Sequence, residues 1–113
     1  MPIDPVTIAG IGVISAIGNN AGECLRSFEQ EQAGIGEIRY LDTVHRLPVG
    51  EVKANNEVLA HLGGVDTPVS RTALLSLIAA KEALEDAAIP GLSGLRTGFI
   101  SANTVGEIGR AHV

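Results

Sequence analysis

The sequence predicts an α/β fold, and three observations support this prediction. Residues 6–14 are an almost entirely apolar run, typical of a strand that is buried on both faces of a covered sheet, and residues 96–102 are interpreted as another buried strand. Between them, residues 67–88 are rich in alanine and leucine with helical periodicity. Hydrophobic residues make up 45% of the chain, but only two Phe and one Tyr are present, so the apolar residues are mainly aliphatic.

Composition and charge exclude several classes of protein. The 113 residues suffice for one domain with a buried core. The formal net charge is −5 and the Lys and Arg residues are scattered singly, which argues against nucleic-acid binding. No apolar run is long enough to span a bilayer, and the N-terminus lacks the basic start and apolar core of a secretory signal. The single cysteine cannot form an internal disulfide, and we expect a soluble cytoplasmic protein.

The first predicted strand, residues 6–14, leads through a Gly-Asn-Asn turn at residues 18–20 into a helix. Asn20 is the expected N-cap, because its side chain can accept from the first turn, and Glu23 follows three residues later as in a capping box. The helix is expected to end at residues 33–36, where a glycine can adopt the left-handed capping conformation.

The middle of the chain is predicted to be irregular between residues 42 and 64. A short extended segment over residues 37–41 precedes it. Within it we expect a turn at residues 47–50, a short strand at residues 51–53, and one or two helical turns over residues 56–62.

The strongest predicted helix covers residues 67–88. Thr67 is its expected N-cap, and Pro68 suits the first helical position because its φ is already helical. Pro90 and Gly91 stop the helix, and the strand at residues 96–102 then ends in a small-residue turn. The apolar stripe of this helix consists of Leu74, Leu77, Ile78 and Leu84.

Four motifs occur in an order that resembles a known enzyme family. Residues 6–19 combine a strand, two glycines spaced one apart, a serine and a turn. Residues 32–36 (Gln-Ala-Gly-Ile-Gly) form a corner after the first helix, residues 79–87 are alanine-rich, and residues 96–106 give a strand and a glycine loop. Together they resemble the opening of the β-ketoacyl-acyl carrier protein synthases, the condensing enzymes of fatty-acid and polyketide synthesis.

The resemblance implies a thiolase-like fold of five alternating αβαβα layers, built from two similar halves. Residues 1–106 would supply the first part of the N-terminal half, as a truncated domain. The family's nucleophilic cysteine, two histidines and lysine lie in later segments, so none has a counterpart here and the chain by itself is expected to be inactive. We also expect it to aggregate or to form a molten state, because its buried strands lack their neighbours.

For the complete protein the resemblance implies a decarboxylating acyltransferase that needs neither an organic cofactor nor a metal. Its partners would be acyl carrier protein and the acyl and malonyl thioesters, and it would form a homodimer. A noncatalytic ketosynthase-like partner subunit, in which the cysteine is lost and the fold sets chain length or dimerisation, is the alternative. The residue at the cysteine position would separate the two.

Residues 107–113 depart from the family pattern, which would continue from Gly106 with another glycine and into a helix. Their sequence resembles the start of a widely used short-read sequencing adapter translated in one frame. We therefore interpret them as a non-native tail, for which an ordinary polar C-terminus is the alternative.

Three further side chains invite a chemical interpretation. Cys24 lies in the first turn of a predicted helix, where the helix dipole could activate a thiolate, but Glu23 opposes this and a packed, inert thiol is favoured. His45 and His61 have no acidic or cysteine neighbours at metal-ligand spacing, so solvated or locally hydrogen-bonded histidines are expected.

Val105 is the one substrate-binding candidate. If Gly98 and Gly106 correspond to the family's glycine loop, the resemblance implies that Val105 borders the acyl-chain pocket. A loop residue packed at a sheet edge is an equally supported interpretation.

A dinucleotide site is a third functional hypothesis. Gly10 and Gly12 follow a strand, and Asp42 could bind a ribose, as in nicotinamide-dependent oxidoreductases. Against this, Ser15 stands where the third glycine is expected, and the turn at residues 18–20 delays the helix, whose N-terminus would otherwise bind the pyrophosphate.

Overall fold

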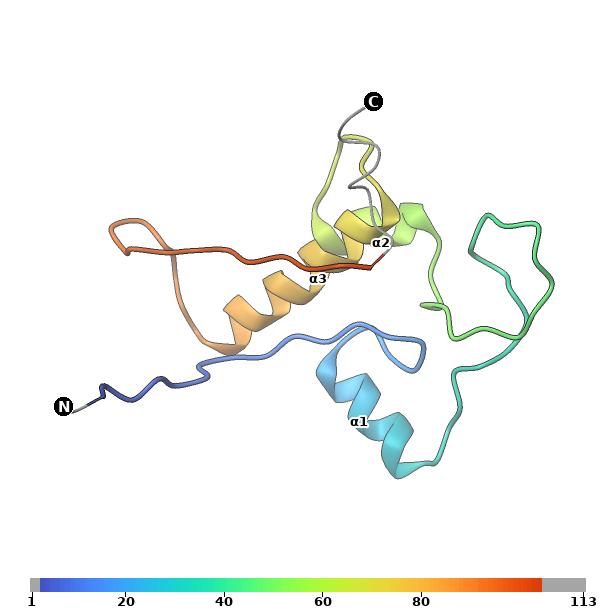
Figure 1. Ribbon diagram of the computed structural model, residues 1–113, viewed down its shortest axis with the longest axis horizontal. Coiled ribbons are helices and arrows are strands. Elements are labelled where there is room, and N and C mark those ends of the chain that lie inside the picture. The colour runs from blue at the N-terminus through green and yellow to red at the C-terminus, as the bar shows by residue number, and fades with distance from the viewer. Residues whose placement is uncertain (1–2, 105–113) are drawn as a thin grey trace.

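The computed structural model describes residues 3–104, which contain three helices (Figure 1). These are α1 (Ala21–Glu29), α2 (Asn56–Gly63) and α3 (Arg71–Asp86). Within the described residues, β-pairing is confined to two isolated bridges, Ser15 with Gly18 and Gly36 with Val49. Residues 107–113, interpreted above as a non-native tail, lie outside the described part of the chain.

Helix α1 begins as predicted and ends earlier. The Asn20 side chain accepts from Glu23 N at 2.8 Å, and the Glu23 carboxylate accepts from Asn19 N at 2.9 Å, one residue before the position it takes in a standard capping box. The predicted end at residues 33–36 is wrong, because Glu31 adopts a left-handed conformation with φ 54° just after Glu29.

Helix α2 confirms the predicted helical turns, and Gly64 ends it with a left-handed φ of 67°. The predicted start of α3 is wrong. Its N-cap is Ser70, whose hydroxyl accepts from Ala73 N at 3.1 Å, and not Thr67. The first helical residue, Arg71, donates from its guanidinium to the backbone oxygens of Val52 and Ala54, each at 2.9 Å, which ties the start of the helix to that segment.

The predicted end of α3 at residue 88 is also slightly late. The helix ends at Asp86, with Ala87 as its C-cap, and Ala88 turns into the left-handed region at φ 56°. The chain has therefore left the helix before it reaches Pro90, the residue expected to stop it.

The core lies between α2, α3 and the segment that precedes α2. Leu59 of α2 is fully buried, and α3 contributes residues of its predicted apolar stripe. Other members of that stripe, Leu77 and Leu84, remain substantially exposed. The buried apolar cluster consists of Val52, Ala54, Leu59, Leu74 and Ile78, with Ile14, Ala60, Val65 and Leu75 packed against it.

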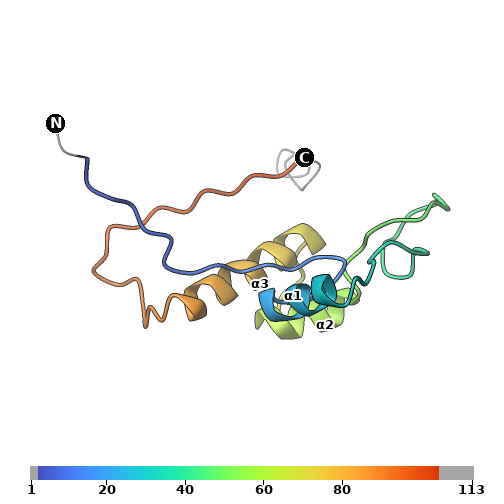
Figure 2. The ribbon, with the colours of Figure 1, turned by 90° about the horizontal axis from the view of Figure 1, so that it is seen from below.

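The two segments predicted as buried strands are extended but exposed. Val6 is 96% exposed and Ile100 is 97% exposed, and no strand of the described residues pairs with either segment. Residues 10–14 run along α3, whereas residues 96–103 stand clear of it in Figure 2. The expected burial is wrong for this chain because no neighbouring strand is present to provide it.

Two predictions for the middle of the chain are also wrong. Residues 47–50 do not turn but run extended, and Val49 pairs with Gly36 through two backbone hydrogen bonds of 2.9 and 3.0 Å. Residues 51–53 form no strand, since no bridge of the described residues includes them and the backbone oxygens of Glu51 and Val52 accept from the side chains of Lys53 and Arg71.

The chain is less compact than a typical domain of its length. Its radius of gyration is 16.6 Å, against about 13 Å for a compact chain of this size. Three helices and extended segments fit neither a complete sheet nor a closed set of layers, so the thiolase-like fold stays a prediction.

Candidate functional site

The glycines of the first motif bring the N-terminal segment against α3. A Cβ atom on Gly12 would clash with the backbone oxygen of Ala79, and one on Gly10 would clash with the backbone oxygen of Ala83. Glycine is therefore required at both positions, because the two backbones approach closely. The small alanine side chains of α3 leave room for this approach.

Two carboxylates of α3 bind the backbone of the same segment. Glu82 accepts from Val13 N at 2.8 Å, and Asp86 accepts from Ile11 N at 3.0 Å. The second oxygen of Glu82 accepts from Ala21 N, in the first turn of α1, at 2.9 Å. One side chain thus links the N-terminal segment, α1 and α3.

This arrangement argues against a dinucleotide site. The N–H groups of Ile11 and Val13, at the glycine pair, already donate to carboxylates, and Glu82 occupies the N-terminus of α1, where a pyrophosphate would bind. A second anion there would be repelled. Asp42 is exposed in the irregular middle of the chain and makes no hydrogen bond within the described residues.

Cys24 is enclosed on the inner side of α1. Its side chain is 6% exposed, and Sγ lies 3.2 Å from the Ser15 hydroxyl and 3.6 Å from the backbone oxygen of Gly18, to which it donates. Ser27, the other buried residue of the helix, donates to the backbone oxygen of Ile17 at 2.6 Å. This geometry is that of a packed thiol that closes a turn.

The two histidines lie apart from these contacts. His45 is exposed, and its backbone N–H donates to the Thr43 hydroxyl at 3.2 Å. His61 is exposed in the last turn of α2. Within residues 3–104, no group of three or more His, Cys, Asp or Glu side chains is placed to hold a metal ion.

Val105, the predicted acyl-pocket residue, lies outside the described residues. The structure therefore brings together two of the sequence-derived features, the glycine pair and the alanine-rich helix. It does not join Cys24, His45 and His61 into one site.

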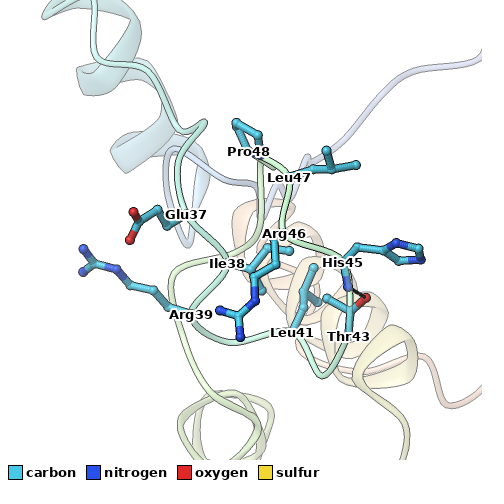
Figure 3. Close-up of a pocket in the computed structure, with 9 residues that line it drawn as sticks. All are labelled: Glu37, Ile38, Arg39, Leu41, Thr43, His45, Arg46, Leu47 and Pro48. Atoms are coloured by element: carbon cyan, nitrogen blue, oxygen red, sulfur yellow. Dashed lines mark hydrogen bonds between the residues drawn. The ribbon is translucent and has the colours of Figure 1, made fainter.

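A cavity of about 520 Å³ lies within the loop that precedes α2 (Figure 3). The arm at residues 37–41 forms one wall and the arm at residues 43–48 forms the other. Figure 3 shows the Arg39 guanidinium and the His45 imidazole directed outward on opposite sides of the loop. Both side chains are exposed to solvent, and because they point in opposite directions they do not converge on a common point.

Glu51 anchors the first arm of this loop. The side chain is 4% exposed, and its two carboxylate oxygens accept from three successive backbone N–H groups. The three donors are Arg39 N, at 2.6 Å, Tyr40 N, at 3.1 and 3.2 Å from the two oxygens, and Leu41 N, at 3.0 Å. Such a set of consecutive N–H groups forms an anion-binding nest, here filled by the chain's own carboxylate.

The charge of Glu51 is favoured by these partners. Burial raises the pKa of Glu51, but the N–H donors of Arg39, Leu41 and Tyr40, together with the Lys53 ammonium, outweigh it, so that the pKa lies below its ordinary value. Lys53 is held nearby because its ammonium donates to the backbone oxygens of Gly34, at 2.6 Å, and of Glu51, at 2.9 Å.

Sequence reasoning missed this anchor. The partners of Glu51 lie 10 to 12 residues before it in the chain, and they are backbone groups that any residue type could provide. The one available signal is the position of an acidic residue next to Val52 and close to Ala54, two residues of the core.

Comparisons of the chain with protein-family models, curated proteins and solved structures found no match. Among the helices of residues 3–104, none has the length and apolar character needed to cross a membrane.

Proposed function

We propose that this chain is the N-terminal part of a β-ketoacyl-acyl carrier protein synthase. The observation that carries the proposal is the order of four motifs along residues 6–106: glycine-pair strand, Gly-Ile-Gly corner, alanine-rich helix, and strand with glycine loop. Each motif is common by itself, but the four in this order and at this spacing are not.

The contact between the first and third motifs supports the proposal. Gly12 is packed on Ala79 and Gly10 on Ala83, 67 and 73 residues later in the sequence, so the small residues of both motifs form one interface. In the proposed enzyme this interface would seat the first strand on its covering helix. A chance collection of glycine and alanine motifs would not require such a contact.

The proposed reaction is a decarboxylative Claisen condensation. A cysteine thiolate attacks the acyl thioester, which forms the acyl-enzyme and releases the carrier-protein thiolate. Malonyl-acyl carrier protein then loses CO₂ to give a carbanion, which attacks the acyl-enzyme carbonyl, forms the β-ketoacyl thioester of the carrier protein and releases the cysteine thiolate. Two histidines stabilise the developing oxyanion, and a lysine supports them. None of these four residues has a counterpart in residues 6–106, so this part of the protein would supply scaffold and the edge of the acyl pocket.

The test is to sequence the source DNA from the codon of Gly106 onward. The proposal expects a reading frame that continues into a cysteine on a tight turn and two later histidines. The encoded full-length protein should then condense acyl and malonyl thioesters of the carrier protein, and a Cys→Ala variant at that turn should abolish product. A frame without the cysteine would favour the noncatalytic partner subunit, and a stop codon directly after Val113 would overturn the proposal.

The acyl pocket provides a second test in that full-length enzyme. If Val105 borders the pocket, Val105→Trp fills part of it and the product distribution shifts to shorter acyl chains. Val105→Ala is the matched variant, and because it removes bulk it should not shift the product distribution to shorter chains. Product profiles by mass spectrometry would decide, and a profile unchanged by Trp would remove Val105 from the pocket.

A further inference from the structure

We propose that Glu51 is a proton-sensitive clasp that holds the loop of residues 37–48 closed around its cavity. The clasp is the carboxylate of Glu51 and the three backbone N–H groups of Arg39, Tyr40 and Leu41. This inference is independent of the condensing activity proposed above.

The loop is tied at its base by other contacts. Gly36 and Val49 exchange two backbone hydrogen bonds, which keep the two ends of the loop together whatever the state of Glu51. Apart from this base, the arm at residues 37–41 is held, among the described residues, by its hydrogen bonds to Glu51. Loss of the carboxylate charge would therefore free this arm without separating the ends of the loop.

The charge on Glu51 makes these bonds strong. A carboxylate accepts four hydrogen bonds, whereas its protonated form keeps less acceptor capacity and a weaker pull on the N–H groups. The charged group that acts on Glu51 is the Lys53 ammonium, two residues further along the chain. The loop faces the carboxylate with the backbone N–H groups of Arg39, Tyr40 and Leu41.

The direction of the pH effect follows from the pKa. Since the folded-state pKa of Glu51 lies below its ordinary value of 4.5, the clasp contributes its full stabilisation at pH values well above 4.5. It loses this contribution as the pH falls through the lowered folded-state pKa. Opening moves the backbone of Arg39 and Leu41, which line the cavity of about 520 Å³, so the cavity wall changes with the clasp.

The chain carries its own reporter. Tyr40 is the only tyrosine and there is no tryptophan, so tyrosine fluorescence of the whole chain reports on the residue at the centre of the clasp. The experiment follows this signal from pH 7 downward, together with far-UV circular dichroism as a measure of the helices. The expected result is a change at Tyr40 at a higher pH than the loss of helix.

Glu51→Gln tests the cause, because the amide mimics the protonated acid at neutral pH. It should give the acid-state Tyr40 signal at pH 7, remove the acid transition, and lower hydrogen-exchange protection of the amides of residues 39–41 roughly tenfold or more. Glu37→Gln removes an exposed carboxylate of the same loop that makes no hydrogen bond within the described residues, and it should leave the transition intact.

Chemical rescue keeps the test decisive if the Gln variant loses its helices. Glu51→Ala vacates the nest, and added formate should restore the Tyr40 signal and the protection of residues 39–41, whereas formamide should not. A Tyr40 transition that coincides with loss of helix, a Gln variant that titrates like the wild type, or an Ala variant that formate does not rescue would each overturn the clasp.

Discussion

Single residues set the distance between the N-terminal segment and α3. Gly10 and Gly12 allow backbone to lie on backbone, and the carboxylates of Glu82 and Asp86 then reach the N–H groups of the intervening residues. The glycine pair was visible in the sequence, but its spacing alone fits a phosphate-binding turn equally well. The acidic residues that exclude an anion lie about 70 positions away, and only the folded chain shows that they face the pair.

Gly12→Ala should detach this segment. The added Cβ would clash with the Ala79 backbone oxygen, an overpacking that typically costs about 1–3 kcal/mol. We expect hydrogen-exchange protection at the amides of Ile11 and Val13 to fall, because their distance to the carboxylates increases. Gly36→Ala is the control, since a Cβ there has no atom within 4 Å. Equal protection in the two variants would contradict the close packing.

At the scale of elements, the helices were largely predictable and the strands were not. The caps of α1 and α2 are Asn residues at local turn positions, so the information lies within a few residues of the helix start. The start of α3 was misplaced because Thr67 and Pro68 satisfy the same local rules as Ser70, and the contacts of Arg71 with Val52 and Ala54 favour the later start.

The strand predictions failed for a different reason. An apolar run specifies a preference for burial on two faces, but burial needs neighbouring strands, and residues 6–14 have none among the described residues. Glu51 shows the same limit at the loop, since its partners are backbone groups with no sequence signature. Local chemistry was thus readable from sequence, and long-range contacts were not.

The packing of α2 on α3 should depend on Leu59. This side chain is fully buried between the helices, and truncation of a buried leucine costs about 2–5 kcal/mol. We expect Leu59→Ala to reduce the far-UV circular dichroism signal of the helices and to broaden thermal unfolding. Leu62→Ala, in the same helix at 39% exposure, should have a smaller effect. Equal losses in both variants would show that the core is not where the packing places it.

The whole molecule combines a small core with a large exposed apolar surface. Five buried apolar side chains form its centre, while large aliphatic and aromatic residues along both extended segments face solvent. Residues 6–19 carry no charge, which leaves their backbone edges without the gatekeepers that natural edge strands use. Such a surface favours association between chains.

We therefore expect concentration-dependent association through residues 6–14, measured by sedimentation velocity. Ile8→Lys places a charge in the middle of the segment and should reduce association, because a buried lysine in a strand pairing is costly. Ile3→Lys adds the same charge at a residue that is 90% exposed outside the segment, and it should change association less. A soluble monomer with a sharp cooperative melt would contradict this prediction.

The link through Glu82 has a consequence for the order of events during synthesis. Its partners, Val13 and Ala21, are made 69 and 61 residues earlier. At a synthesis rate of about 5–20 residues per second, roughly 3 to 14 seconds pass between the synthesis of these two residues and that of their shared acceptor, Glu82. During that interval the uncharged residues 6–19 are open to any protein that binds nascent hydrophobic segments, and this exposure lasts until Glu82 has been made.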